Sequence, residues 1–415
     1  MANEHTAPVS RRAEALAQRW RYVERAVFAL AFCYTGYSLV AGLVQYLSAT
    51  GQGRGFMSDF LEPFHSREYY KSALAIIGLL ISAFTVWEIA RLLVRELRDD
   101  RARTWGLEKV RRFASALIAD YQATFLVALV LEFLPRLIVI DMFWKWQPTF
   151  QKLSLFSVGH NWYGWIYALL VWELSTWVWH FGAHRIRVFW CLHSPHHAPA
   201  NFNMTVAWVH FFAEGYVTAV IQLVILMVLG VAPATLVVIM TLEALWGTLI
   251  HAGERTLKTG RLGWARFFII TPSHHRVHHA RNPLYMDTNF CTMLPVWDWM
   301  FGTLQPLRDE VRIEYGITRK TETGSFIDLY FGECVALFRD LRQARGWRLR
   351  LQYAFKPPGW RPNDTQHTAA VVRGEFLRTR PELGIASKRQ WLQRLRGPSA
   401  TGGYHTRSSG TAKSR

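Results

Sequence analysis

The feature that most constrains the fold is a series of long apolar segments. A helix needs about 20 consecutive apolar residues to cross the roughly 30 Å hydrocarbon core of a bilayer. Segments that approach or exceed this length occur at 26–47, 72–94, 115–141, 162–180, 204–230 and 232–251. They predict an all-α integral membrane bundle with about four to six transmembrane helices. The number of crossings is given as a range because the last three segments contain His, Glu and Trp, and polar residues favour contact with protein over contact with lipid.

The composition agrees with a membrane protein and indicates which class of partner the chain binds. The chain is 51% hydrophobic and 14% aromatic, which departs from an ordinary soluble protein. Its formal charge of +18 comes from basic residues between the apolar segments, so we expect anionic lipid headgroups as partners and no nucleic acid. The cysteines form no CxxC pair, and neither a zinc ribbon nor a disulfide framework is predicted.

Loop charge predicts the orientation. Residues 1–25 and 95–112 are rich in Arg and Lys, whereas the loops 48–71 and 142–161 contain few. Cytoplasmic loops retain basic residues. Both termini and the histidine motifs described below are therefore expected on the cytoplasmic side, in either a bacterial inner membrane or the endoplasmic reticulum.

Four regions follow from these patterns. Residues 1–160 are predicted to form an N-terminal membrane region of about three helices, and 161–303 to contain the functional site. Residues 304–396 form a basic cytoplasmic region whose amphipathic stretch, 325–353, is expected to lie on the membrane surface. The tail at 397–415 is rich in Gly, Ser and Thr and is expected to be disordered.

Histidines concentrate in the second region. Of the 16 histidines, 11 lie between His180 and His279. They include an HxxxH motif at 180–184 and HxxHH motifs at 193–197 and 275–279. Spacings of three and four place side chains on one helix face. The motifs supply more nitrogens than one ion with an open site can use, so two metals are predicted in a histidine-rich cap. Imidazole suits Zn, Cu, Fe and Ni alike, and spacing alone does not choose among them.

Four sequence blocks carry a resemblance to a known family. They are HFGAH at 180–184, FWCLHSPHH at 189–197, TPSHHRVHH at 271–279 and DTNFCTMLPVWDWMFGT at 287–303. Together they resemble the fatty acid hydroxylase and sterol desaturase superfamily of membrane di-iron oxygenases, and most of all its alkylglycerol monooxygenase-like and bacterial sterol-desaturase-like branch. The resemblance covers about 165–303, so 161–303 is expected to be a fatty acid hydroxylase-like catalytic domain.

The resemblance implies the metal and its ligands. It implies two iron ions held by His180, His184, His193, His196, His197, His251, His275, His278 and His279, with His274 as a further candidate. The second nitrogen of a metal-bound imidazole usually needs an acceptor. Candidates for this role are Asp287, Asn289 and Glu173, together with Asp298 and Glu254, and Asp287 is favoured because it belongs to a family-like block.

Three positions depart from the family pattern. Phe181 stands where Arg is common, and Cys291 stands where Gly often follows the Asn-Phe pair. An Arg usual after the first HxxHH is absent from NMTVAWVHFF, which contains His210. His210 and His160 are interpreted as packing or hydrogen-bonding residues, whereas Glu214 and Glu243 fit a substrate cavity and a buried hydrogen bond equally well.

The predicted function is O2-dependent hydroxylation of a C–H bond in a membrane lipid such as a sterol, fatty acyl or ether lipid. Desaturation of a lipid or sterol by the same class of enzyme is the nearest alternative, and a non-catalytic membrane metal-binding protein is the alternative from another class. The chain has no GxGxxG after a strand and no haem or iron–sulfur motif of its own, so the reducing equivalents come from outside. The resemblance implies cytochrome b5, ferredoxin or a tetrahydropterin as donor.

Overall fold

The computed structural model describes residues 162–231, 233–321 and 326–384, with a few isolated positions between 87 and 155. This part of the chain is mostly helical and contains no strand, as the predicted all-α class requires. The α-helices are α6 (Trp162–Arg185), α7 (Arg187–His197), α8 (Glu214–Val228), α9 (Pro233–Ile250), α10 (Pro272–His278), α11 (Val296–Phe301), α12 (Phe326–Gln343), α13 (Trp347–Phe355) and α14 (Ala369–Thr379). The 3-10 helices are η3 (Met204–Trp208), η4 (Gly263–Phe267) and η5 (Pro381–Leu383).

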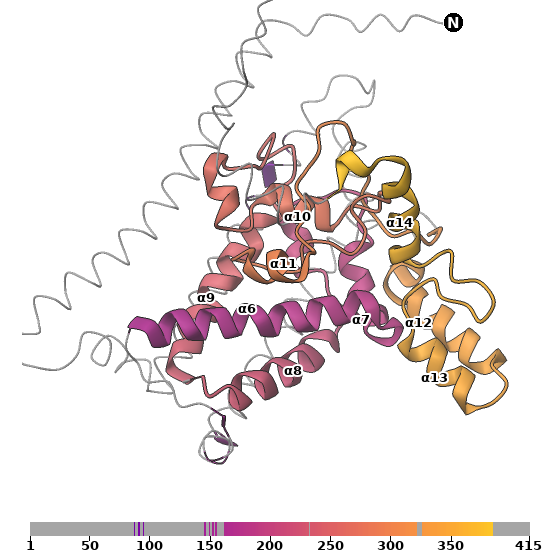
Figure 1. Cartoon of the computed structure of the whole chain (residues 1–415), viewed down its shortest axis with the longest axis horizontal. Coiled ribbons are helices and arrows are strands. Elements are labelled where there is room, and N and C mark those ends of the chain that lie inside the picture. The colour runs from indigo at the N-terminus through magenta and orange to yellow at the C-terminus, as the bar shows by residue number, and fades with distance from the viewer. Residues whose placement is uncertain are drawn as a thin grey trace, which may run out of the picture.

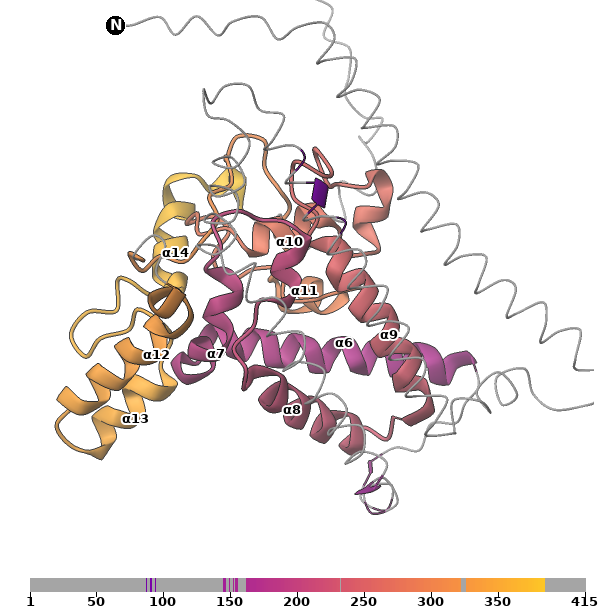
Figure 2. The ribbon, with the colours of Figure 1, turned by 180° about the vertical axis from the view of Figure 1, so that it is seen from behind.

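Helix α6 runs along the described region, with α8 below it and α7 at its end (Figure 1). Helices α8 and α9 pack against it and enclose an apolar core that includes Trp172, Leu226 and Ile239. The turn between α8 and α9 uses Gly230, whose φ of 67° favours a residue without a side chain. Seen from behind, α7 adjoins one end of α6, and α10 lies between α9 and α14 (Figure 2). This packing brings the carboxyl ends of α6, α7 and α9 together.

A break after α6 turns the chain into the next helix. Ile186 is extended, with φ of −120° and ψ of 115°, and α7 begins at the following residue. Helix α7 packs against both α6 and α12, and Arg187 at its start forms an ion pair of 2.6 Å with Asp340 of α12. The HxxHH motif at the other end of α7 is thus held between two helices.

The segment after α10 is fixed by two fully buried carboxylates. Glu173 of α6 accepts hydrogen bonds from the backbone amides of Met293 and Leu294, at 3.1 and 3.2 Å, and of the residue before them. Asp298 of α11 accepts from the amides of residues 290 and 291 at 2.8 and 2.9 Å. Backbone amides buried without an acceptor are costly, so these carboxylates give the irregular segment one conformation.

Helix length and continuity differ from the sequence expectation at one segment. The predicted apolar stretch 204–230 is not one continuous helix, because it divides into η3 and the 15-residue helix α8, which begins at Glu214. Asn203 caps η3 by accepting from the amide of Thr205 at 3.0 Å, and the chain bends before α8. None of the helices in the described ranges is long and apolar enough to cross a membrane. The predicted segments 26–47, 72–94 and 115–141 lie outside these ranges, apart from isolated positions.

The C-terminal region packs onto the histidine-bearing helices. The predicted amphipathic stretch 325–353 forms α12 and α13, which are separated at Gly346, where φ is 85°. Helix α12 buries Leu329 and Leu337 and exposes Val335 and Phe338. The tail at 397–415 lies outside the described residues, and the four predicted region boundaries remain predictions.

The role of Asp298 gives a stability prediction. Replacing Asp298 with Ala leaves two buried amides without their acceptor, at a cost of about 1–3 kcal/mol each. We expect a clearly lower melting temperature for the detergent-purified variant in a thermal unfolding experiment. The control is Asp309→Ala, which removes a surface ion pair with Arg261 and should leave melting unchanged. Equal melting of both variants would show that Asp298 does not hold the segment.

Candidate metal centre

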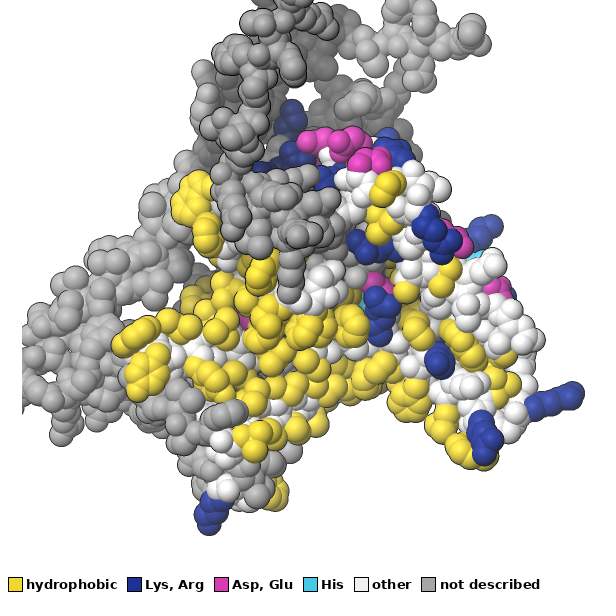
Figure 3. Space-filling model, in the orientation of Figure 1, with side chains coloured by type: hydrophobic (Ala, Val, Ile, Leu, Met, Phe, Trp, Pro, Cys, Tyr) yellow, Lys and Arg dark blue, Asp and Glu magenta, His cyan; other side chains and the backbone are white. Residues whose placement is uncertain are grey.

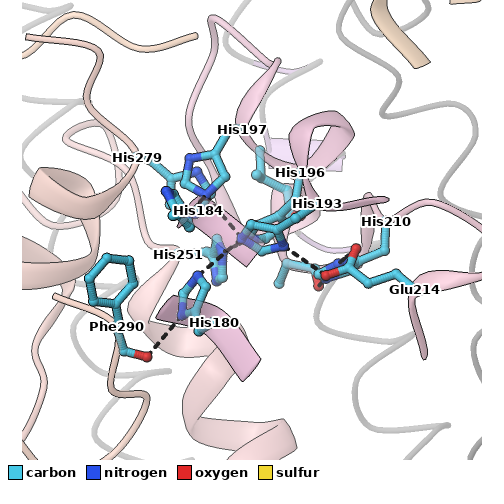
Figure 4. A network of polar contacts seen from close by, with 12 residues as sticks. His180, His184, His193, His196, His197, His210, Glu214, His251, His279 and Phe290 are labelled. Carbon is cyan, nitrogen blue, oxygen red and sulfur yellow. Dashed lines mark hydrogen bonds and ion pairs between the residues drawn. The ribbon is translucent and has the colours of Figure 1, made fainter. Parts of the chain in front are cut away.

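Nine histidines from four helix ends converge in one buried region. HxxxH ends α6, the first HxxHH ends α7, His251 follows α9, and the second HxxHH forms α10 and its cap. Figure 4 shows the rings facing one another. All nine are buried, with the most exposed, His180, at 9%. The structure therefore brings together every histidine that the resemblance implied, except the additional candidate His274.

The nine histidines form two adjacent groups in which the ligand atoms lie within 4.8 Å of one another. We call them the five-histidine group and the four-histidine group. The five-histidine group consists of His180, His184, His193, His197 and His278. The four-histidine group consists of His196, His251, His275 and His279.

Each HxxHH motif serves both groups. In α7, His193 and His197 belong to the five-histidine group and His196 to the other. In α10 the assignment is reversed, because His275 and His279 share the four-histidine group while His278 faces the five-histidine group. Residues three and four apart lie on one side of a helix, so each motif can direct two of its rings to one group and the third to the adjacent group.

Distances between ring nitrogens match those of neighbouring ligands on a metal. An ion held about 2.1 Å from two imidazole nitrogens at right angles places them about 3.0 Å apart. In the five-histidine group, Nε2 of His193 lies 3.0 Å from Nε2 of His180 and 3.1 Å from Nε2 of His197. The same kind of contact occurs in the four-histidine group, where Nε2 of His275 lies 2.8 Å from that of His251 and 3.1 Å from that of His279.

The hydrogen bonds made by the outer ring nitrogen, Nδ1, explain why Nε2 faces the centre of each group. Nδ1 of His180 donates to the carbonyl of Phe290 at 2.8 Å, and Nδ1 of His278 donates to that of Thr288 at 2.8 Å. In the four-histidine group, His196 and His251 donate in the same way to the carbonyls of residues 206 and 247. A carbonyl oxygen only accepts, so Nδ1 carries the hydrogen and the neutral ring presents the Nε2 lone pair.

The residues present fit a pair of cations. Burial lowers the pKa of His278 to about 3, and burial followed by neighbouring imidazoles lowers the pKa of His196, His197 and His279 well below 6.5. Neutral rings with facing lone pairs at these distances repel unless a cation lies between them. The buried Nε2 of His278 has no hydrogen-bond partner in the described part of the chain, as expected for an atom that takes a metal instead.

Three of the predicted outer residues occupy different places. Oδ1 of Asp287 lies 3.5 Å from Nδ1 of His184, and its other oxygen lies 3.1 Å from Nε of Arg185. Burial raises the pKa of Asp287 to about 6, and Arg185 opposes that shift. The carboxylate of Glu173 receives backbone amides, and Asn289 donates to the carbonyls of residues 274 and 305. Among the three, only Asp287 contacts a histidine of the two groups through its side chain.

His274 lies outside both groups. Its Nδ1 interacts with the amide and the hydroxyl of Thr271, each at 3.2 Å, in a capping box that starts α10. A capping box satisfies amides that the first helical turn leaves free. In this arrangement His274 positions the motif that follows it.

Sequence reasoning did not assign the role that the structure gives to His210 and Glu214. Oε1 of Glu214 accepts from Nδ1 of His193 at 2.7 Å, and Oε2 accepts from Nδ1 of His210 at 2.9 Å. The ring of His210 also stacks on His196, with centroids 4.3 Å apart. The spacing of four between His210 and Glu214 indicates that they can pair, but nothing in the sequence connects them to His193.

Comparisons with known proteins agree with this site. Residues 165–303 match the fatty acid hydroxylase family. The alkylglycerol monooxygenase of Xenopus tropicalis is 28% identical over 273 residues, covering 57% of this chain and 58% of the relative. That of Homo sapiens is 27% identical, covering 51% and 49%, and that of Danio rerio is 29% identical, covering 52% and 50%.

The chain spans about half the length of the curated relatives it matches. No solved structure matches it. The matched family segment contains all nine histidines of the two groups. These matches confirm the resemblance read from the histidine blocks: residues 165–303 match the fatty acid hydroxylase family, and the relatives that the chain is similar to are alkylglycerol monooxygenases.

Proposed function

We propose that this chain is a di-iron monooxygenase that hydroxylates a C–H bond of a membrane lipid. The observation that carries the proposal is the pair of adjacent histidine groups, in which neutral Nε2 atoms face one another at about the spacing of metal ligands. Two bound irons would supply the redox chemistry with O2 that side-chain acids and bases lack. The five-histidine group would hold one ion and the four-histidine group the other.

The substrate we propose is an ether lipid of the alkylglycerol type. The support is that the relatives named above are alkylglycerol monooxygenases. A tetrahydropterin, cytochrome b5 or ferredoxin would supply the electrons, because the sequence has no nucleotide, haem or iron–sulfur motif of its own.

Aromatic side chains enclose the candidate centre. Phe290 lies against His180 and His184, with ring centroids 5.6 and 5.2 Å apart. Phe202 lies against His251 and His279 at 5.5 and 4.9 Å. These rings exclude water from the ligand set and hold the histidine planes in place, which favours controlled oxidation over side reactions.

A membrane location on the cytoplasmic side belongs to the same proposal. Helix α8 exposes Val220, Val224 and Val228 along one stripe, and the start of α6 exposes Tyr163 and Ile166. Figure 3 shows hydrophobic side chains gathered over these two helices. An apolar surface of this kind fits contact with lipid. The number of crossings and the orientation rest on the apolar segments and on loop charge.

Metal content tests the two groups separately. We expect the purified chain, reconstituted with Fe²⁺ without oxygen, to bind two ions. His278→Ala should weaken the five-histidine group and His275→Ala the four-histidine group, so each variant should lose about one ion by elemental analysis. His274→Gln is the matched control, because Gln at this position preserves a capping box and the residue lies outside both groups. Loss of metal from the control alone would contradict the assignment.

Turnover distinguishes the proposal from its alternatives. With Fe²⁺, a reductant and an alkylglycerol in mixed micelles, we expect O2 consumption that depends on the lipid and is abolished by His278→Ala. Mass spectrometry should find a product with one added oxygen atom, whereas a desaturase would remove two hydrogens. Sterol and fatty acid run in parallel test the substrate class. Stable binding of two ions without turnover on any lipid, with each of the three donors, would favour the non-catalytic metal-binding alternative.

A further inference from the structure

The two histidine groups differ in the charge that lies behind their rings. In the five-histidine group, Nδ1 of His193 donates to the carboxylate of Glu214 at 2.7 Å. Nδ1 of His184 lies 3.5 Å from the carboxylate of Asp287. A carboxylate behind a metal-bound imidazole raises the basicity of the ring and fixes its orientation. Two of the five ligands in this group thus have an anionic partner.

The four-histidine group has only neutral partners among the described residues. His196 donates to the carbonyl of Val206 at 3.0 Å, and His251 donates to that of Gly247 at 2.6 Å. The buried Nδ1 of His275 has no hydrogen-bond partner in the ranges that the structure describes. Since a carbonyl is a weaker acceptor than a carboxylate, these rings are weaker donors to a cation, and there are four of them instead of five.

Glu214 contributes more to this difference than Asp287. One oxygen of Asp287 lies 3.1 Å from the guanidinium of Arg185, which offsets its charge. Glu214 is 3% exposed, and each of its oxygens receives one imidazole N–H, from His193 and from His210. Two donors hold the carboxylate in one orientation. Figure 4 shows Glu214 and His210 at the edge of the cluster, joined to it through His193.

His210 lies on the side of the other group. Its ring stacks on His196 with an interplanar angle of 12°. His210 thus contacts a ligand of the four-histidine group through its ring, while its Nδ1 holds Glu214, which accepts from His193 of the five-histidine group.

We propose that Glu214 is a positioning residue that makes the five-histidine group the tighter metal position, which fills first and empties last. The inference rests on the proposed function, which makes the two histidine groups a di-metal centre, and it concerns the unequal affinity of the two groups for metal. His210 supports Glu214 by holding its second oxygen. The two positions load in order.

The test is an anaerobic titration of the metal-free full chain in detergent with Co²⁺, against a competing chelator, followed by the visible ligand-field bands. Wild-type protein should show two binding classes of unequal affinity. His275→Ala should remove the weaker class and His278→Ala should weaken the tighter one. Glu214→Gln should raise the Kd of the tighter class about 10- to 100-fold, shift its bands, and leave the weaker class unchanged.

Three further variants complete the experiment. Glu254→Gln is the matched control, because its carboxylate accepts from Tyr315 and not from a histidine of the groups, and it should leave both classes unchanged. Glu214→Asp should restore part of the affinity. His210→Gln keeps the carboxylate of Glu214, so it should weaken the tighter class less than Glu214→Gln does. It also provides a test of the inference if Glu214→Gln does not fold.

Two results would overturn the inference: wild-type classes of equal affinity, or a Glu214→Gln variant that weakens both classes equally or neither. Failure of the proposed function is a separate result, because it appears as absence of lipid-dependent O2 consumption in protein that binds two ions. Equal classes in a chain that does turn over lipid would reject only the inference about Glu214.

Discussion

A buried imidazole has two nitrogens to satisfy, and the candidate centre depends on how this chain satisfies the outer one. Each Nδ1 that meets a carbonyl, such as that of Phe290 for His180, directs an Nε2 lone pair inward. The acceptor must stay in place for this to hold. Residue 290 is in an irregular segment that would move without Asp298, which accepts its amide at 2.8 Å. The direction in which Nε2 of His180 points thus depends on Asp298, which does not itself contact that histidine.

Much of the site could be predicted from the sequence, because the spacing of histidines determines which of them lie on the same helix face. The nine implied ligands meet, and Asp287 lies beside His184. What the spacing leaves undetermined is the partner of each side chain in three dimensions. Glu173 is on α6 with His180, yet its carboxylate receives the amides of a segment about 120 residues later. Among the described residues those amides have no other acceptor, and this requirement is not visible in the sequence.

The fold was less predictable than the site. Apolar composition marks a segment as buried without saying whether lipid or protein surrounds it. The stretch 204–230 has the length of a crossing, but Asn203 caps a short 3-10 helix at its start, and Glu214 bonds to His193 and His210 where α8 begins. The Asn203 cap and the bond from His210 are local, and none of these hydrogen bonds is visible in the hydropathy of the stretch. They hold Glu214, at the start of α8, beside the histidines.

The division of each HxxHH motif between the two groups also sets how close the groups are. His196 and His197 are consecutive, as are His278 and His279, and the members of each pair belong to different groups. Neighbouring Cα atoms are about 3.8 Å apart, so the backbone keeps the two positions adjacent whatever the loops do. The rings of His197 and His279, one from each group, stack with centroids 4.4 Å apart. A displacement of α7 or α10 would alter both positions together, so the positions differ in the number of histidines and in the charge behind the rings, and not through a separate scaffold for each.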